Sequence, residues 1–205
     1  GTANTIFGKS AGASLDAGSN YNVFVGEGVS DATMNDATYN VGVGYFALSA
    51  LTTGDNNTTL GANSGLALST GIRNVFIGHA AGTVTVDVDK AIFIGYNAGA
   101  GGNIDSDADG SVGIGEHSLY ALTSGQGNTA VGFQSLFTED DGDFNTAVGY
   151  QALTAQTGST GTVGNTAIGY QSGASITAGQ YSTAVGYRAL YTEDATNYST
   201  AIGYT

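Results

Sequence analysis

Hydrophobic and polar residues follow one another along this chain in a short pattern that recurs at a nearly constant interval. In each copy, two bulky or β-branched residues lie two positions apart, with one residue between them and a glycine directly after them. A period of two places alternate side chains on one face of an extended strand, and β-branched residues favour that backbone. The pattern therefore predicts a three-residue strand that ends at a glycine.

Twelve glycines mark the copies of this strand, and successive glycines are 17, 18 or 20 residues apart. They are Gly8, Gly26, Gly44, Gly61, Gly78, Gly95, Gly115, Gly132, Gly149, Gly169, Gly186 and Gly203. This period is too short for a pair of helices and suits one coil of a β-solenoid. We predict an all-β parallel β-roll, or β-solenoid, of about twelve 17–20-residue coils. It forms one repeat domain over residues 1–205, with each glycine at a turn where positive φ or close backbone approach is needed.

The two bulky columns of the strand share one face, which we predict to be the interior. The residue before each glycine is always large and apolar, and the residue three before it is always Thr, Val or Ile. The column between them is mostly Ala or Gly, and we expect it to face outward. Small outward residues let a second roll approach closely, and cyclic symmetry allows three rolls, so the pattern predicts a homotrimer.

Two further columns recur in most copies. Four residues before the glycine, eight copies have Asn and three have Ser, which predicts a structural corner and a ladder of stacked amides. The residue directly after the glycine is aromatic in seven copies: Tyr45, Tyr96, Phe133, Tyr150, Tyr170, Tyr187 and Tyr204. These rings either fill a core or an interface, or form an exposed ladder that stacks on sugars or packs on a protein.

The segment NTAVGYQAL, residues 145–153, resembles the head repeats of trimeric autotransporter adhesins and related repeats of bacteriophage tail-fibre proteins. The matching positions are Thr146, Ala147, Val148, Gly149 and Ala152, and the other copies match in the same columns. The resemblance implies a left-handed parallel β-roll in which three chains associate along one axis. The coils here are longer than is usual in that family, and Asn is one residue closer to Gly, so the family's role for Asn is not transferred.

Charge and composition limit the classes of molecule that this chain can bind. Seventeen acidic and four basic residues give a formal net charge of −13, which disfavours nucleic acid and anionic membranes as partners, since both are bound through clustered cations. No apolar run is long enough to insert into a membrane. The absence of cysteine excludes disulfides and fits an extracellular location. Fifteen of the acidic residues lie six to thirteen positions before a glycine, which predicts an acidic stripe along one outer edge.

One acidic segment also suggests a cation. Residues 105–116, DSDADGSVGIGE, match the calcium-loop pattern through Asp105, Asp107 and Asp109, with Glu116 at the twelfth position. The extended strand that follows carries Glu116 too far away to share the ion. Asp105, Asp107 and Asp109 are therefore candidate calcium ligands, and a solvated acidic surface that prevents lateral aggregation is the alternative.

No nucleophile, histidine pair or phosphate loop recurs in the repeats, which indicates a protein without enzymatic activity. We expect a fibrous attachment protein, a rigid trimeric segment of a cell-surface adhesin or phage tail fibre that contacts a host glycan or protein. The other expected partner is a further copy of the same chain. A structural extracellular filament of end-to-end subunits is the alternative, and a glycan depolymerase is a minor one, because acidic residues gather along one edge.

Overall fold

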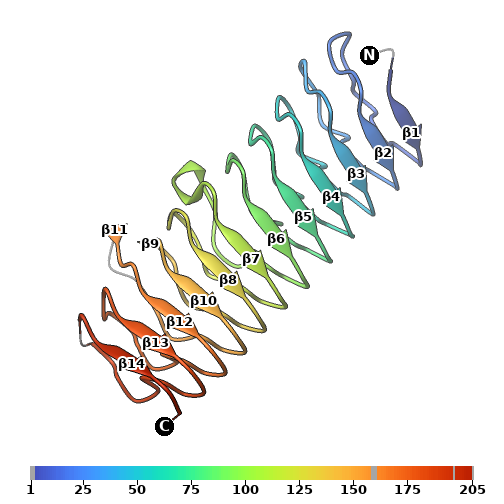
Figure 1. Cartoon of the computed structure of the whole chain (residues 1–205). Coiled ribbons are helices and arrows are strands. Elements are labelled where there is room, and N and C mark those ends of the chain that lie inside the picture. The colour runs from blue at the N-terminus through green and yellow to red at the C-terminus, as the bar shows by residue number, and fades with distance from the viewer. Residues whose placement is uncertain (1–2, 158–160, 196, 205) are drawn as a thin grey trace.

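The computed structural model describes residues 3–157, 161–195 and 197–204, which form one elongated coil of stacked short strands (Figure 1). Twelve strands form a single parallel sheet in chain order, so they enclose eleven complete turns. Each strand residue pairs with its counterpart in the next copy, as Thr146 does with Thr166. The first and the last strand of this sheet lie at opposite ends of the rod. The predicted all-β solenoid with coils of about 17 residues is confirmed.

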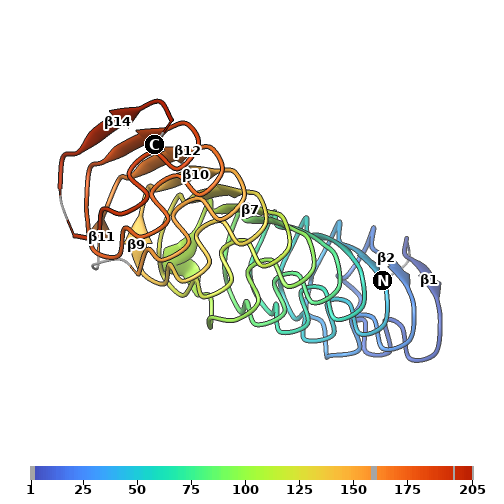
Figure 2. The same ribbon diagram turned by 90° about the horizontal axis from the view of Figure 1, so that it is seen from below.

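The strands of the long sheet have three residues each. They are β1 (Thr5–Phe7), β2 (Val23–Val25), β3 (Val41–Val43), β4 (Thr58–Leu60), β5 (Val75–Ile77), β6 (Ile92–Ile94), β7 (Val112–Ile114), β8 (Thr129–Val131), β10 (Thr146–Val148), β12 (Thr166–Ile168), β13 (Thr183–Val185) and β14 (Thr200–Ile202). The two-stranded sheet of β9 (Gly142–Asp143) and β11 (Gly161–Thr162) is separate, and η1 (Ser106–Ala108) is one 3-10 turn. The turn η1 and strand β11 lie in the two 20-residue coils, on a different edge of the rod from the long sheet (Figure 2).

The glycine after each strand is required by both conformation and space. The twelve glycines of this column have φ between +128° and +142°, a region that residues with a side chain rarely adopt. A Cβ added at any of the first eleven would lie 2.1–2.5 Å from the carbonyl oxygen of the glycine in the next coil. The predicted turn role of this column is therefore confirmed, and the close stacking of successive coils explains it.

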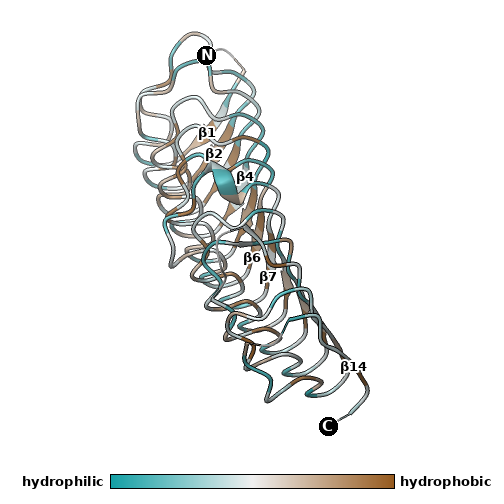
Figure 3. Cartoon of the chain, turned by 90° about the vertical axis from the view of Figure 1, so that its left-hand side faces the viewer, coloured by the Kyte–Doolittle hydropathy of each residue, from teal (hydrophilic) through white to brown (hydrophobic). Residues whose placement is uncertain are grey.

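The interior is formed by the middle residue of each strand, and the prediction about the two bulky columns is wrong. Phe24, Phe76 and Phe93 are fully buried, and so are Ala130 and Ala147. The residues on either side of them are partly or largely exposed in every strand. A period of two defines two faces, but it does not say which face is inside. The bulky columns face outward, and the hydrophobic strands follow one side of the coil (Figure 3).

Most coils fill their narrow interior by pairing the middle strand residue with the residue six positions later. The coil of Ala167 and Gly173 is an exception, because both residues are small and the side chains of Leu153 and Ile176 occupy the space beside Gly173. Where the strand contributes a phenylalanine, the later residue is small: a Cβ on Gly82 would lie 2.8 Å from Phe76, and one on Gly99 would lie 2.7 Å from Phe93. Where the strand contributes a small residue, the later residue is usually leucine. The small-with-leucine pairs are Gly42 with Leu48, Gly113 with Leu119, Ala130 with Leu136, Ala147 with Leu153 and Ala184 with Leu190.

The asparagines before the strands form the predicted ladder. The backbone N–H of Asn57 donates to Oδ1 of Asn40 at 2.9 Å, and Nδ2 of Asn57 donates to the carbonyl of Gly71 at 2.8 Å. Asn22, Asn40, Asn57 and Asn74 repeat the first of these bonds from coil to coil. Both polar atoms of the buried amides thus have hydrogen-bond partners, and the ladder links each coil to the next at the same corner.

Within the described ranges, none of the helical segments is long and apolar enough to cross a membrane.

Candidate functional site

The outward side of the long sheet is a continuous face without charge, which we call the strand face. It consists of the first and third residues of each strand: Thr5, Phe7, Val23, Val25, Val41, Val43, Thr58, Leu60, Val75, Ile77, Ile92, Ile94, Val112, Ile114, Thr129, Val131, Thr146, Val148, Thr166, Ile168, Thr183, Val185, Thr200 and Ile202. Leu60 is 50% exposed and Ile168 is 42% exposed. An uncharged apolar face of this length on a chain with a net charge of −13 is typical of an interaction surface.

The strand face changes character along the rod. In the long sheet, the first strand residue from β2 to β7 is Val or Ile in all strands but β4, and in β8, β10, β12, β13 and β14 it is always Thr. We call these parts the aliphatic half and the threonine half. The hydroxyls of Thr129, Thr146, Thr166 and Thr183 form no hydrogen bond with any part of the chain that the structure describes. They are therefore available to water or to a partner.

The aromatic column forms a stack in its C-terminal part. The rings of Phe133, Tyr150, Tyr170, Tyr187 and Tyr204 follow one another with centroids 5.0–5.2 Å apart and interplanar angles of 8–14°. The three inner tyrosines, Tyr150, Tyr170 and Tyr187, are 41–43% exposed, so the stack is an exposed ladder on this chain rather than part of its core. Because each ring covers the face of its neighbour, these inner rings offer only their edges and hydroxyls to a sugar or a protein.

The N-terminal members of the aromatic column are more isolated. Tyr45 packs edge to face against Phe46, with centroids 4.4 Å apart, and Tyr96 stacks on His79 at 5.4 Å. The second histidine, His117, lies edge-on to Tyr96, and its Nε2 is 3.3 Å from Nδ2 of Asn97. Both histidines are therefore members of a ring cluster on this edge.

A ladder of amides that was not predicted from the sequence lies directly beside the tyrosine stack. Nε2 of Gln151 donates to Oε1 of Gln134, Nε2 of Gln171 donates to Oε1 of Gln151, and Nε of Arg188 donates to Oε1 of Gln171, each at 2.9 Å. The signal was present in the sequence, because these residues occupy the second position after four successive repeat glycines.

Several acidic residues of the outer edge support the backbone of the preceding coil. Oδ1 of Asp55 accepts from the N–H of Thr38 at 2.6 Å, and Oδ1 of Asp89 accepts from the N–H of Ile72 at 2.8 Å. Asp143 does the same for the N–H of Gln126. These carboxylates replace a backbone carbonyl at a corner, which is a structural role that the charge pattern alone did not reveal.

The candidate calcium ligands lie around η1. Oδ1 of Asp105 accepts from the N–H of Asp107 at 3.0 Å and caps the 3-10 turn, while Oδ1 of Asp109 accepts from the N–H of Asp89 at 2.7 Å. The structure does not bring these three carboxylates together as a compact group among the described residues. Calcium binding at Asp105, Asp107 and Asp109 stays a prediction, and calorimetric titration with calcium tests it.

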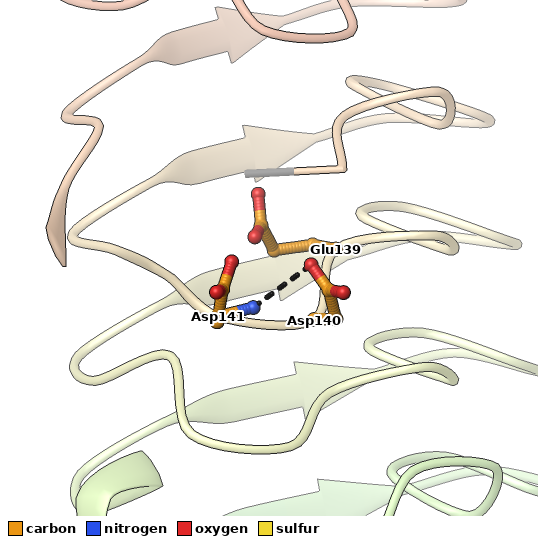
Figure 4. A group of neighbouring side chains, drawn as sticks. All are labelled: Glu139, Asp140 and Asp141. Carbon is orange, nitrogen blue, oxygen red and sulfur yellow. Dashed lines mark hydrogen bonds between the residues drawn. The ribbon is translucent and has the colours of Figure 1, made fainter. Parts of the chain in front are cut away.

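A different acidic group is compact. One carboxylate oxygen from each of Glu139, Asp140 and Asp141 lies within 4.8 Å of the others (Figure 4). Glu139 is fully buried, and this corrects the prediction of a wholly solvated acidic stripe. Its Oε1 accepts from the N–H of Gly142 at 2.7 Å, and its Oε2 accepts from Nδ2 of Asn145 at 3.3 Å. Burial raises the pKa of Glu139 to about 7, and the charges of Asp140 and Asp141 also raise it.

The burial of Glu139 has a structural explanation. It is the seventh residue after its repeat glycine, a position held in other coils by buried Leu51, Leu68 and Leu122. In the next coil this position is Gln156, whose Oε1 accepts from Nδ2 of Asn165 at 2.8 Å. Glu139 and Gln156 therefore supply polar atoms to the asparagine ladder from inside the coil.

No protein-family model matches the chain, and comparisons with curated proteins and with solved structures give no match. The chain is a repeat protein of the parallel β-solenoid class. Its function must therefore be argued from its surfaces.

Proposed function

We propose that this chain is a rigid segment of a non-enzymatic, extracellular attachment fibre, in which three copies associate side by side through the strand face. The single observation that supports this proposal is the uncharged strand face, which extends over all twelve strands. The resemblance of the repeats to adhesin heads and tail-fibre repeats supports the number three and a location on a cell or virion surface.

Charge supports a second copy of the chain as the occupant of this face. Two copies carry the same net charge of −13, and therefore repel one another wherever their acidic edges meet. The strand face has no acidic or basic residue, so copies can approach there without burying like charges. A cationic partner would instead be attracted to the acidic edge.

The dimensions of the face also support self-association. Twelve strands spaced at about 4.8 Å, with a width of about 10 Å, give on the order of 600 Å² on each copy. A stable interface commonly buries about 800 Å² on each partner, so one narrow face is near the lower limit. Three copies around one axis cover each face with two neighbours, and the resulting cyclic assembly is closed.

The host contact would be made by the edges that the assembly leaves open. The tyrosine stack and the amide ladder form one strip in which Arg188 is the one charged member. Tyr and Gln side chains bind both glycans and proteins through hydrogen bonds. The rod itself serves as a spacer, because each coil is bonded to the next along its whole length.

Sedimentation velocity tests the proposal. The unmodified chain should sediment as three copies at micromolar concentration. The double variant Ile77→Lys and Ile94→Lys, which places charges in the strand face, should sediment as a single folded copy. Thr70→Lys is the matched control, because Thr70 is exposed away from the strand face. A folded single copy of the unmodified chain at tens of micromolar would contradict the proposal. Labelled trimer should bind host cells more tightly than the Ile77/Ile94 variant, because it presents three copies of the tyrosine and amide strip.

A further inference from the structure

We infer that the threonine half of the strand face sets the register and the direction in which copies of this chain associate. The inference rests on the self-association proposed above. It addresses a difficulty that any repetitive face has, because one copy can slide along another by whole coils. A slip of one coil leaves eleven of the twelve strands in contact, and the aliphatic side chains meet side chains of the same kind.

The strand face has one feature that removes this ambiguity. The first strand residue is Val23, Val41, Val75, Ile92 or Val112 in the aliphatic half, with Thr58 as an isolated exception. It is Thr129, Thr146, Thr166, Thr183 and Thr200 in the threonine half, without interruption. The third strand residue is aliphatic in both halves, so the change affects a single column. The two halves of the face therefore differ in one property, which is the presence of a row of hydroxyls.

Hydroxyls discriminate between registers because they must be satisfied when they are buried. The hydroxyls of Thr129, Thr146, Thr166 and Thr183 have no partner within the described ranges. When three parallel copies are in register and this column lies nearest their common axis, the threonines of all three copies meet at the same height, and their hydroxyls can bond to one another. In a slipped or antiparallel assembly, some or all of them would meet Val or Ile and lose hydrogen bonds without replacement.

The same logic is known from coiled coils, where a buried polar residue in an apolar seam fixes register and orientation. Here the aliphatic half contributes most of the apolar contact. The threonine half destabilises slipped and antiparallel assemblies, because they leave buried hydroxyls without hydrogen bonds. The other irregular features, η1 and β11, lie on a different edge of the rod and so do not supply this alignment within the strand face (Figure 2).

Distance measurement between spin labels tests the inference. The chain has no cysteine, so Ala13→Cys gives a single label site at an exposed position in the first coil. Parallel copies in register should give one narrow distance. Replacing all five threonines with valine should preserve assembly but add longer distances, because slipped and antiparallel copies separate the labels along the axis.

Two matched variants serve as controls. Replacing the same five threonines with serine keeps the hydroxyls and should retain the single distance. The changes Val131→Ile, Val148→Ile and Val185→Ile alter the neighbouring column without touching a hydroxyl, and should also retain it. If the unmodified chain does not assemble, the proposed function fails. If it assembles and the five-valine variant still gives one narrow distance, only the inference about register is overturned.

Discussion

The coils that begin at β5 and β6 and those that begin at β8 and β10 enclose the same interior with opposite choices of side chain. In the first pair the strand contributes Phe76 or Phe93, and the facing corner is glycine. In the second pair the strand contributes alanine and the facing corner is leucine, Leu136 or Leu153, which is fully buried. The backbone is the same in both, since strand pairing continues in register from β5 to β10.

This difference shows that these four coils specify a total volume for the two positions rather than a residue at each position. The corner backbone is left-handed in both cases, with φ of +58° at Gly82 and +49° at Leu153. Glycine is therefore not needed there for its conformation, and leucine occupies the same φ with some strain. What selects glycine beside Phe76 is the space that the phenyl ring occupies, because close packing leaves no room for both.

The largest expected effect concerns a position that the two kinds of coil share. Gly132→Ala places a Cβ 2.3 Å from the carbonyl oxygen of Gly149 at a φ of +135°, and Gly95→Ala has the same conflict with Gly115. Each should lower the free energy of unfolding by about 4 kcal/mol or more, measured by urea unfolding. Gly110→Ala is the control, since its φ is +75° and nothing lies within 4 Å, and it should cost about 1–2 kcal/mol. Equal effects at Gly132 and Gly110 would contradict the stacking explanation.

The requirement for a constant total volume at the two positions, which we call the volume rule, is tested by converting one kind of coil into the other. Phe76→Ala alone should destabilise the chain by about 3–5 kcal/mol through a cavity, and Gly82→Leu alone should destabilise it by overpacking. The double variant recreates the combination found at Ala147 and Leu153, and should recover most of the loss. Recovery will be incomplete by about 1 kcal/mol, because Phe76 also stacks on Phe93 at 5.3 Å. Additive effects in the double-mutant cycle would refute the rule.

Glu139, in one coil of the threonine half, should make the stability of the chain depend on pH. Its pKa rises from 4.5 in the unfolded chain to about 7 in the folded one, so the folded state holds the proton over that interval. Stability should therefore fall as the pH increases from about 4.5 to 7, by about 3 kcal/mol. Glu139→Gln should remove this dependence and be more stable than the unmodified chain at pH 8. Parallel stability curves for the two proteins between pH 4 and 8 would count against a buried, protonated carboxyl.

The smallest effect concerns the aromatic column, whose members stack on one another in the threonine half but not in the aliphatic half. Tyr170 stacks on both Tyr150 and Tyr187, whereas Tyr45 has an edge contact with Phe46. Tyr170→Ala should therefore cost about 1 kcal/mol more than Tyr45→Ala in thermal or urea unfolding. Equal losses would mean that the stack adds nothing beyond the burial of each ring.

The sequence predicts the repeat, the strand and the turn because each depends on local chemistry. The glycine column and the asparagine column read as corners, and the structure confirms both. The pairing of Phe76 with Gly82, and of Ala147 with Leu153, was also visible as a correlation between two columns. Neither column predicts the pairing when taken alone, because packing depends on the combined volume of the two side chains.

By itself, the sequence determined the period, the all-β class and the position of every strand of the long sheet, since these follow from a spacing of two within a spacing of about 17. It did not predict the second sheet of β9 and β11. Only the tertiary structure decided which side of the strand is interior. Alternation is symmetric between the two faces, and the expectation that the bulkier columns lie inside assumed that a single coil buries all of its apolar residues. The interior is too narrow for both columns, so Val and Ile face outward, where they form the face on which the proposed association depends.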